Sequence, residues 1–233
     1  TGGICGTDLS SYRGNFAYFD FPRVVGHEFA AEIIEIDENE YALTKGMRVT
    51  CNPYFNCKKC YPCTHGHVNC CENNQTMGVQ REGAFSNYIT MPVERIYDGK
   101  GLDPHKLALV EPFCISLHGV SRADIKPKEK VLVVGAGTIG VFAAKAAMLK
   151  GGEVTICDVS ENKLEIARGL GIPNTLLNDD PETFMEKVNE ITDHNGFDVT
   201  IEAVGLPSTF QNCLDAVCFH GRVVLIGVSK RNI

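Results

Sequence analysis

The sequence lacks the features that would assign it to a membrane or to nucleic acid. No run of Lys and Arg occurs among its 233 residues, and the formal net charge is −7. Phosphate backbones and anionic lipids attract basic surfaces, so both partners are disfavoured. Charged residues interrupt every apolar run before it could span a bilayer, and no secretory signal is visible. We therefore expect a cytoplasmic protein that binds neither nucleic acid nor a membrane.

An initiator methionine is also lacking. The chain opens inside what looks like a motif, Thr1-Gly2-Gly3, and it stops just after a strand-like run at 222–227. We expect it to be a piece of a longer protein. Its length and its 44% content of hydrophobic residues still allow a sizeable core and one or two domains.

Cysteine, by contrast, is abundant. The chain has 11 cysteines, an odd number, whereas a secreted disulfide scaffold is usually short and has an even number. Five of them cluster tightly between positions 57 and 71, and the others are scattered. This distribution indicates metal binding in a reducing compartment, with the scattered cysteines as small apolar fillers.

The cluster has the spacing of a closed metal site. Its main members are separated by two, two and seven residues: Cys57, Cys60, Cys63 and Cys71. Such spacing lets backbone amides wrap one ion while four thiolates complete a tetrahedron. Because no coordination position stays open, we predict a structural zinc in a lobe over 57–71, which has few core residues and needs the metal to fold. Three neighbours compete for places in this set: Cys70, His65 and His67.

A second candidate metal site combines two distant motifs. Cys5 lies in Gly3-Ile4-Cys5-Gly6-Thr7-Asp8, and His27 and Glu28 follow Gly26. A thiolate, a neutral imidazole and a carboxylate form a mixed set that suits zinc. Three protein ligands leave a position open for a substrate, which is typical of a catalytic metal. The alternative is a buried cysteine and histidine that never meet.

The first half of the chain favours β-structure. Short β-type runs broken by Gly and Pro occur up to residue 56, among them 29–36, which alternates partly, and 46–51. Strand character returns within 83–97, at 84–90. A helix is then expected from Pro104, with Asp103 as its N-cap. Helical character resumes after Pro112.

From Lys130 onward, strands and helices alternate. The run 131–134 is continuously apolar, as in a buried parallel strand. The alternation predicts a doubly wound α/β sheet of five strands. One more helix and one more strand would be needed for the full six-stranded sheet. The predicted strands are 131–134, 154–157, 174–177, 197–203 and 222–227. The first predicted helix follows the glycine-rich motif and ends at Lys150, and the other three span 161–170, 182–192 and 208–218.

A glycine-rich motif follows the first of these strands. Gly135 allows a tight turn, Gly137 lets the backbone approach a pyrophosphate, and Gly140 lets helix and strand pack closely. Asp158, 23 residues after Gly135, can bind both hydroxyls of the adenosine ribose and would repel a 2′-phosphate, so NAD is favoured over NADP. Lys163 and Arg168 lie nearby and weaken this preference. The expected cofactor contacts also include Thr138, Ile139 and Lys163.

These motifs resemble the zinc-dependent medium-chain alcohol dehydrogenase family. The resemblance covers nearly the whole chain, and Leu109-Val110-Glu111-Pro112-Phe113 is similar to the polyol (sorbitol) and threonine dehydrogenase branch. Within it, Asn69-Cys70-Cys71-Glu72 is most similar to the bacterial L-galactonate dehydrogenases. The resemblance implies a GroES-like, β-rich catalytic domain over 1–115 and a Rossmann NAD-binding domain over 116–233, both truncated.

The resemblance also implies roles for individual residues. Cys5 and His27 would bind the catalytic zinc. Of Glu28 and Glu111, one would be a further zinc ligand, and the other would bind the zinc directly or through a water molecule. Thr7 would take the proton of the substrate oxygen, and Asp8 would orient the site. Many members have His three positions after this Thr, where this chain has Ser10. An exit of the proton through water and Glu111 is the alternative.

The implied activity is hydride transfer from a secondary alcohol to NAD. The substrate would be a polyol, a sugar acid or a hydroxy amino acid, and the protein would be a homo-oligomer, a dimer or a tetramer. Two alternatives stay open: an NADP-dependent aldehyde or ketone reductase of the same family, and a non-catalytic module that binds zinc and a nucleotide.

Overall fold

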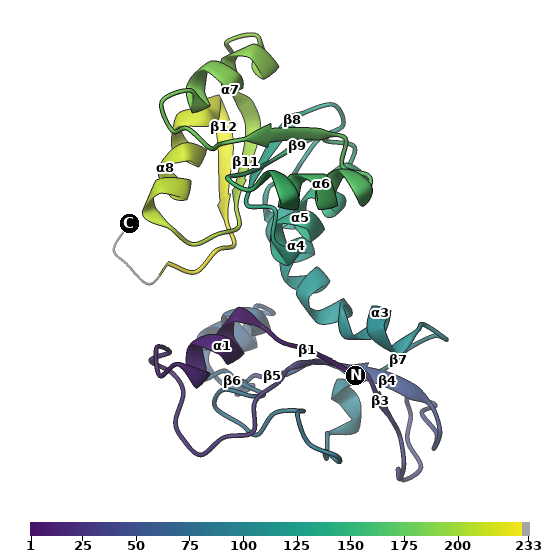
Figure 1. Cartoon of the computed structure of the whole chain (residues 1–233). Coiled ribbons are helices and arrows are strands. Elements are labelled where there is room, and N and C mark those ends of the chain that lie inside the picture. The colour runs from purple at the N-terminus through teal and green to yellow at the C-terminus, as the bar shows by residue number, and fades with distance from the viewer. Residues whose placement is uncertain (230–233) are drawn as a thin grey trace. The chain divides into compact units, whose positions relative to one another are not determined.

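The computed structural model describes residues 1–229 (Figure 1). The chain divides into two compact units, Thr1–Glu111 and a second that begins at Pro112. The division falls inside helix α4 (Val110–Arg122), which also contains the boundary expected from the sequence. No helix within the described residues is long and apolar enough to cross a membrane.

The first unit consists of small antiparallel sheets. A three-stranded sheet has the order β3-β4-β7, and two further pairs are β1-β2 and β5-β6. Small apolar clusters around Phe29 and Ile33 form its core. The strands are β1 (Gly2–Gly3), β2 (Glu28–Phe29), β3 (Ala31–Glu32), β4 (Arg48–Cys51), β5 (Tyr54–Phe55), β6 (Gln75–Thr76) and β7 (Ile96–Asp98). The helices are α1 (Gly6–Tyr12), α2 (Tyr61–Thr64), η1 (Val68–Cys70), η2 (Val93–Arg95) and α3 (Pro104–Ala108).

Two local expectations for this unit need correction. The strand-like run at 29–36 is divided between β2 and β3 and ends at Glu32. Residues 84–90, expected as a strand, form none. Their first residues bond to the segment before His27, with the Phe85 N–H donating to the Val25 carbonyl at 3.0 Å, but no regular ladder continues.

The start of α3 agrees with its sequence signal. Asp103 Oδ1 accepts a hydrogen bond of 2.9 Å from the His105 backbone N–H, which is the capping contact expected of Asp at this position. Pro104 occupies the first turn, where a missing N–H costs nothing.

The second unit is built on a five-stranded parallel sheet of order β10-β9-β8-β11-β12. Its strands are β8 (Lys130–Val134), β9 (Glu153–Asp158), β10 (Asn174–Leu177), β11 (Phe197–Glu202) and β12 (Val217–Leu225). The connecting helices are α5 (Thr138–Leu149), α6 (Glu161–Gly169), α7 (Phe184–Thr192) and α8 (Pro207–Ala216). The first strand of the unit, β8, lies in the middle, so the chain winds outward in both directions from it.

Helices cover both faces of this sheet (Figure 1). In β8, Val131 and Val133 pack into the cluster that includes α5 and α6, whereas Leu132 and Val134 pack into the cluster that includes α7 and α8. Side chains of a strand alternate between the two faces, so a strand buried on both sides must be continuously apolar. The doubly wound α/β prediction is confirmed.

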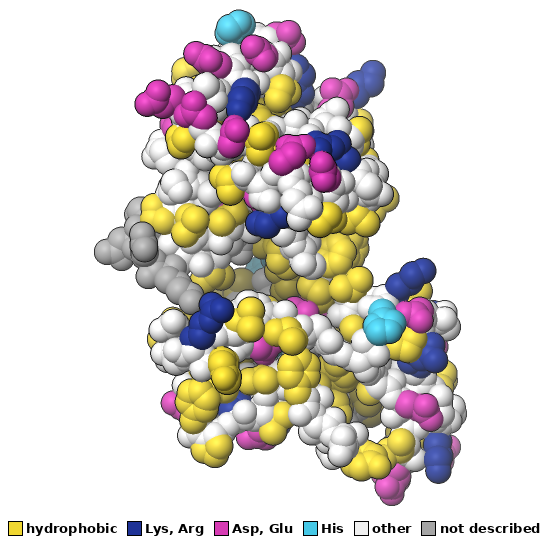
Figure 2. Space-filling view, viewed as in Figure 1, with side chains coloured by type: hydrophobic (Ala, Val, Ile, Leu, Met, Phe, Trp, Pro, Cys, Tyr) yellow, Lys and Arg dark blue, Asp and Glu magenta, His cyan; other side chains and the backbone are white. Residues whose placement is uncertain are grey.

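Some of the charged side chains form local ion pairs. On the face drawn in Figure 2, Lys and Arg side chains lie scattered among Asp and Glu side chains. Examples are Lys187 with Asp179 at 3.2 Å and Lys126 with Asp124 at 2.7 Å. Exposed pairs of this kind contribute little to stability.

Candidate metal centres and dinucleotide site

Asp8 connects the two segments that carry the first candidate metal site. Its side chain is 5% exposed, and Oδ2 accepts a hydrogen bond of 2.8 Å from the Cys5 backbone N–H. Oδ1 accepts one of 3.3 Å from the Gly26 N–H, immediately before His27. One carboxylate thus fixes the start of α1 relative to the segment that leads into β2.

The structure brings Cys5, His27 and Glu28 together. One ligand atom of each lies within 4.8 Å of the others. Strands β1 and β2 pair so that Gly3 lies opposite Glu28, and the missing side chain of Gly3 makes room for the Glu28 carboxylate. His27 Nδ1 is buried and has no hydrogen-bond partner within the described residues. An orphaned ring nitrogen beside a thiol and a carboxylate fits a metal ligand better than a packed core histidine.

The electrostatics of this site favour a cation. Burial by itself lowers the pKa of His27, but the Cys5 thiol and the carboxylates of Glu111 and Asp8 outweigh it and raise the pKa to about 9. Burial raises the pKa of Glu28 and of Glu111. A site that attracts a proton this strongly would also attract a divalent metal ion, and its donor atoms suit zinc.

Glu111 lies outside this tight set. It is 7% exposed in the first turn of α4, and its Oε1 accepts a hydrogen bond from the Tyr54 hydroxyl. Burial and the neighbouring Glu111 raise the pKa of Tyr54, so the phenol keeps its proton. Sequence reasoning missed Tyr54 because it belongs to no motif and carries no signal that separates it from a core aromatic residue.

Thr7 and Ser10 both lie on α1, downstream of Cys5. Thr7 is partly buried, and its carbonyl accepts a hydrogen bond of 2.9 Å from the Ser11 hydroxyl. This bond secures the helix that carries the Thr7 side chain.

The four-cysteine lobe has the geometry of a zinc site. The sulfurs of Cys57, Cys60, Cys63 and Cys71 lie within 4.8 Å of one another, and the Cys60–Cys71 sulfur distance is 3.8 Å. Four sulfurs at about 2.3 Å from zinc lie about 3.8 Å apart in a tetrahedron. Backbone N–H groups of Lys59 and Cys60 lower the pKa of the Cys57 thiol to about 6, which favours the thiolate that binds metal.

The three competitors lie outside this set. Cys70 is exposed, and its sulfur accepts a hydrogen bond of 3.5 Å from the Asn69 side chain. His65 stacks on Tyr61 with ring centroids 3.9 Å apart, and its Nδ1 lies 2.8 Å from the Tyr61 carbonyl. His67 is the exposed residue that precedes η1.

The glycine-rich turn connects β8 to α5 at the carboxyl edge of the parallel sheet. Gly135 has φ +108°, a conformation that L side chains rarely adopt, and its N–H donates to the Cys157 carbonyl at 2.7 Å. A Cβ on Gly140 would overlap the Gly135 carbonyl oxygen, whereas one on Gly137 would meet nothing within 4 Å. Gly140 is therefore required for packing, and Gly137 keeps the N-terminus of α5 open, with Thr138 and Ile139 in its first turn.

Asp158 ends β9 next to this turn. Its Oδ2 accepts a hydrogen bond of 2.8 Å from the Ala136 N–H and lies 3.4 Å from Lys163 Nζ. Oδ1 accepts one of 3.0 Å from the Ser160 N–H. The acid thus holds the glycine-rich turn in place, and the half-exposed Lys163 ammonium reaches it.

Glu202 is a second acid at this edge, and the sequence analysis did not include it. It ends β11 opposite Val134 of β8 and is 2% exposed. Its Oε1 accepts hydrogen bonds from the Val204 and Gly205 N–H groups, both at 2.9 Å, and from the Thr209 hydroxyl at 2.7 Å. An acid at the carboxyl end of a predicted strand, like Asp158, was the available signal.

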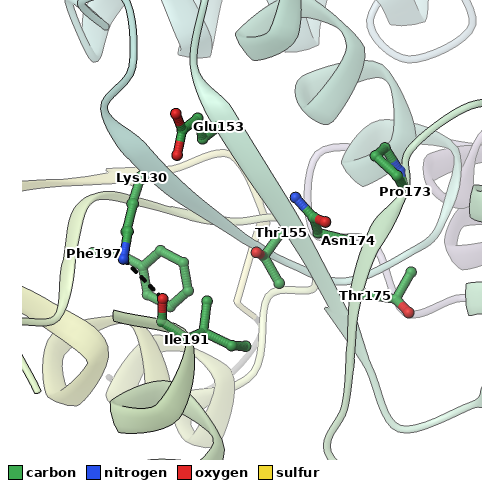
Figure 3. A pocket seen from close by; sticks show the side chains of 8 residues that line it. All are labelled: Lys130, Glu153, Thr155, Pro173, Asn174, Thr175, Ile191 and Phe197. Carbon is green, nitrogen blue, oxygen red and sulfur yellow. Dashed lines mark hydrogen bonds between the residues drawn. The ribbon is translucent and has the colours of Figure 1, made fainter. Parts of the chain in front are cut away.

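A cavity of about 460 Å³ lies at the opposite edge of the sheet (Figure 3). It is lined by the first residues of four strands, Lys130, Glu153, Asn174 and Phe197, and by neighbouring side chains. The Lys130 ammonium is engaged there with the Ile191 carbonyl at 2.9 Å. Ligands of doubly wound sheets bind at the carboxyl ends of the strands, so this cavity is not the dinucleotide site.

Comparison with known proteins places both halves of the chain in one family. Residues 1–100 match the alcohol dehydrogenase GroES-like domain, and residues 138–233 match the zinc-binding dehydrogenase family. The L-galactonate-5-dehydrogenase of Escherichia coli K12 is 39% identical over 98% of this chain and 67% of its own length. The L-threonine 3-dehydrogenase of Pseudoalteromonas atlantica is 32% identical over 99% of this chain and 68% of its own length.

Solved structures give the same result. A zinc-binding dehydrogenase of Sinorhizobium meliloti bound to NADP has a TM-score of 0.90 and 30% identity, covering 100% of this chain and 68% of that one. An alcohol dehydrogenase of Escherichia coli CFT073 complexed with NADH has a TM-score of 0.87 and 29% identity, and the match covers 99% of this chain and 67% of that one. The chain thus spans about two thirds of the length of these proteins.

The fold and its sites define a metal-dependent oxidoreductase that uses a nicotinamide cofactor. One chain carries a thiolate–imidazole–carboxylate site, a four-thiolate site and a glycine-rich dinucleotide turn. The chain belongs to the zinc-dependent alcohol dehydrogenase family. It is an oxidoreductase that acts on CH–OH donors and uses zinc and NAD(P). The family prediction and the prediction of an enzyme are confirmed.

Proposed function

We propose that this chain carries the zinc-binding and NAD-binding machinery of a dehydrogenase for a secondary alcohol of a polyol, a sugar acid or a hydroxy amino acid. The observation that carries the proposal is the convergence of Cys5, His27 and Glu28, whose ligand atoms lie within 4.8 Å of one another although the residues come from separate segments. The named activities of relatives on galactonate and threonine support the substrate class.

In this proposal Cys5, His27 and Glu28 hold the catalytic zinc, and Glu111 is the outer acid of the site. The zinc, when bound, supplies a Lewis acid that lowers the pKa of the substrate hydroxyl toward neutrality. Asp8 keeps Cys5 and the segment before His27 in register through its two backbone hydrogen bonds. The Thr7 hydroxyl would relay the proton that leaves the alcohol, accepting it while passing its own proton on toward the nicotinamide ribose, and the burial of His27 limits access of water to the donor set.

NAD would accept the hydride, and the chain's part is to bind and orient it. The N-terminus of α5 beside Gly137 offers free backbone N–H groups to the pyrophosphate. Asp158 binds the adenosine ribose and disfavours the 2′-phosphate of NADP. The Lys163 ammonium partly offsets the negative charge of Asp158 and so weakens this preference. The four thiolates of Cys57, Cys60, Cys63 and Cys71 hold the structural zinc.

We also propose that the protein acts as a homo-oligomer in the cytoplasm.

Cys5→Ser tests the proposal. The variant should lose one of two zinc ions per chain and all alcohol oxidation, and it should still bind NADH with the affinity of the parent. Zinc content by atomic absorption, NADH fluorescence titration and a panel of polyols, sugar acids and hydroxy amino acids measure these quantities. Full zinc content and undiminished turnover in Cys5→Ser would refute the assignment.

A further inference from the structure

Tyr54 is the one hydrogen-bond donor to the Glu111 side chain within residues 1–229. Its hydroxyl donates to Glu111 Oε1, and Glu111 takes part in no ion pair in the described chain. Glu111 is 7% exposed, so water cannot replace the phenol freely. A buried carboxylate without a donor is costly, and this single contact therefore decides where the group rests.

The backbone of Tyr54 is fixed on several sides. Its N–H donates to Asn52 Oδ1 at 3.0 Å, its carbonyl accepts from the Arg95 guanidinium, and it pairs with Thr76 across β5 and β6. Arg95 is itself held, with its Cζ 4.4 Å from the centre of the Phe55 ring. The phenol is thus preorganised before any ligand arrives.

The placement of Glu111 separates it from the direct ligands. The donor atoms of Cys5, His27 and Glu28 fall within 4.8 Å of one another, and no atom of Glu111 joins this set. A fourth protein ligand would complete a closed tetrahedron, as in structural zinc sites, and would remove the position that a substrate needs. Something must therefore keep a nearby buried carboxylate away from the ion.

We propose that Tyr54 is a positioning residue that holds Glu111 off the catalytic metal and so keeps the substrate position open. This inference rests on the proposed function, since it takes Cys5, His27 and Glu28 as the direct ligands. Without the phenol, the metal ion becomes the nearest partner for the Glu111 carboxylate. Glu111 then binds the ion as a fourth protein ligand.

The test uses the full chain with cobalt at this site and the spectrum of the four-cysteine cluster as internal reference. Tyr54→Phe should retain the ion, change the visible cobalt spectrum and weaken the binding of imidazole, a probe of the open position, by about 10- to 100-fold. Tyr54→Phe combined with Glu111→Gln should restore the spectrum and imidazole affinity of Glu111→Gln alone. Tyr97→Phe, at an exposed tyrosine of β7, is the matched control and should change nothing.

The outcomes separate two failures. If Cys5→Ser keeps the cobalt signal of this site, the proposed function is wrong. If Cys5→Ser loses that signal but Tyr54→Phe leaves the spectrum and imidazole affinity within twofold of the parent, only the role of Tyr54 is wrong. Loss of the ion from Tyr54→Phe, or failure of Glu111→Gln to reverse its effect, also overturns the inference.

Discussion

Replacing Glu202 by alanine tests whether one buried acid organises the carboxyl edge of the parallel sheet. Its Oε1 accepts three hydrogen bonds, from the N–H groups of Val204 and Gly205 and from the Thr209 hydroxyl. The Val204 side chain in turn packs on the glycine-rich turn, since a Cβ on Gly135 would lie 2.6 Å from Val204 Cγ2. Removing the acid should therefore loosen both the loop after β11 and the turn after β8.

The size of the effect follows from these contacts. A hydrogen bond to a charged group contributes roughly 1.5–3 kcal/mol, but bonds that share one acceptor are not additive. We expect Glu202→Ala to lower the free energy of unfolding by about 3 kcal/mol. Glu202→Gln keeps an acceptor oxygen and loses only the charge, so its loss should be about 1 kcal/mol.

Urea unfolding followed by circular dichroism measures the stability, and NADH fluorescence measures the dinucleotide site. Glu202→Ala should weaken NADH binding more than its stability loss alone explains, because the turn itself moves. Asp215→Asn serves as control, since Asp215 is exposed and, among residues 1–229, bonds only to Gln211 on the same helix. A loss below about 1 kcal/mol in Glu202→Ala would contradict the reasoning.

Three further changes test other parts of the molecule. Cys60→Ser should release one zinc per chain and lower the melting temperature, whereas Cys70→Ser should do neither; equal zinc contents in the two variants would argue against the four-thiolate site. Gly140→Ala should destabilise the second unit through its clash with the Gly135 carbonyl, while Gly137→Ala should fold normally and bind NADH more weakly, which a melting curve and a titration separate. Asp158→Asn keeps an acceptor for the glycine-rich turn but removes the charge, so the ratio of NADP to NAD affinity should rise several-fold, and an unchanged ratio would count against its role in cofactor choice.

The fold of the second unit was predictable because its signals are local. A continuously apolar run such as 131–134 has to be buried on both faces, and Gly135 after it has a positive φ that residues with a side chain rarely adopt. The first unit was harder. Its strands are two to four residues long. The segment 84–90 has strand-forming residues, but Phe85 and its neighbours follow the Val24–Gly26 segment for only a few hydrogen bonds, so no regular strand forms.

The metal sites show the same division between local and distant information. The spacing of Cys57 to Cys71 was enough to identify a closed cluster. The convergence of Cys5 with His27 and the contact of Tyr54 with Glu111 join residues 22 and 57 positions apart. The first pair was recognisable from its chemistry, but nothing in the sequence around Tyr54 distinguishes it from a core aromatic residue.

The four-cysteine lobe has a consequence for how metal supply affects this protein. Within 57–71 only Cys71 is buried, so under the proposed zinc assignment the segment depends on that ion rather than on a core. Two exposed lysines, Lys58 and Lys59, lie between the first two thiolates. Loss of the ion would therefore open a trypsin site in the middle of the catalytic unit, and the rate of limited proteolysis would report how well the chain is supplied with zinc.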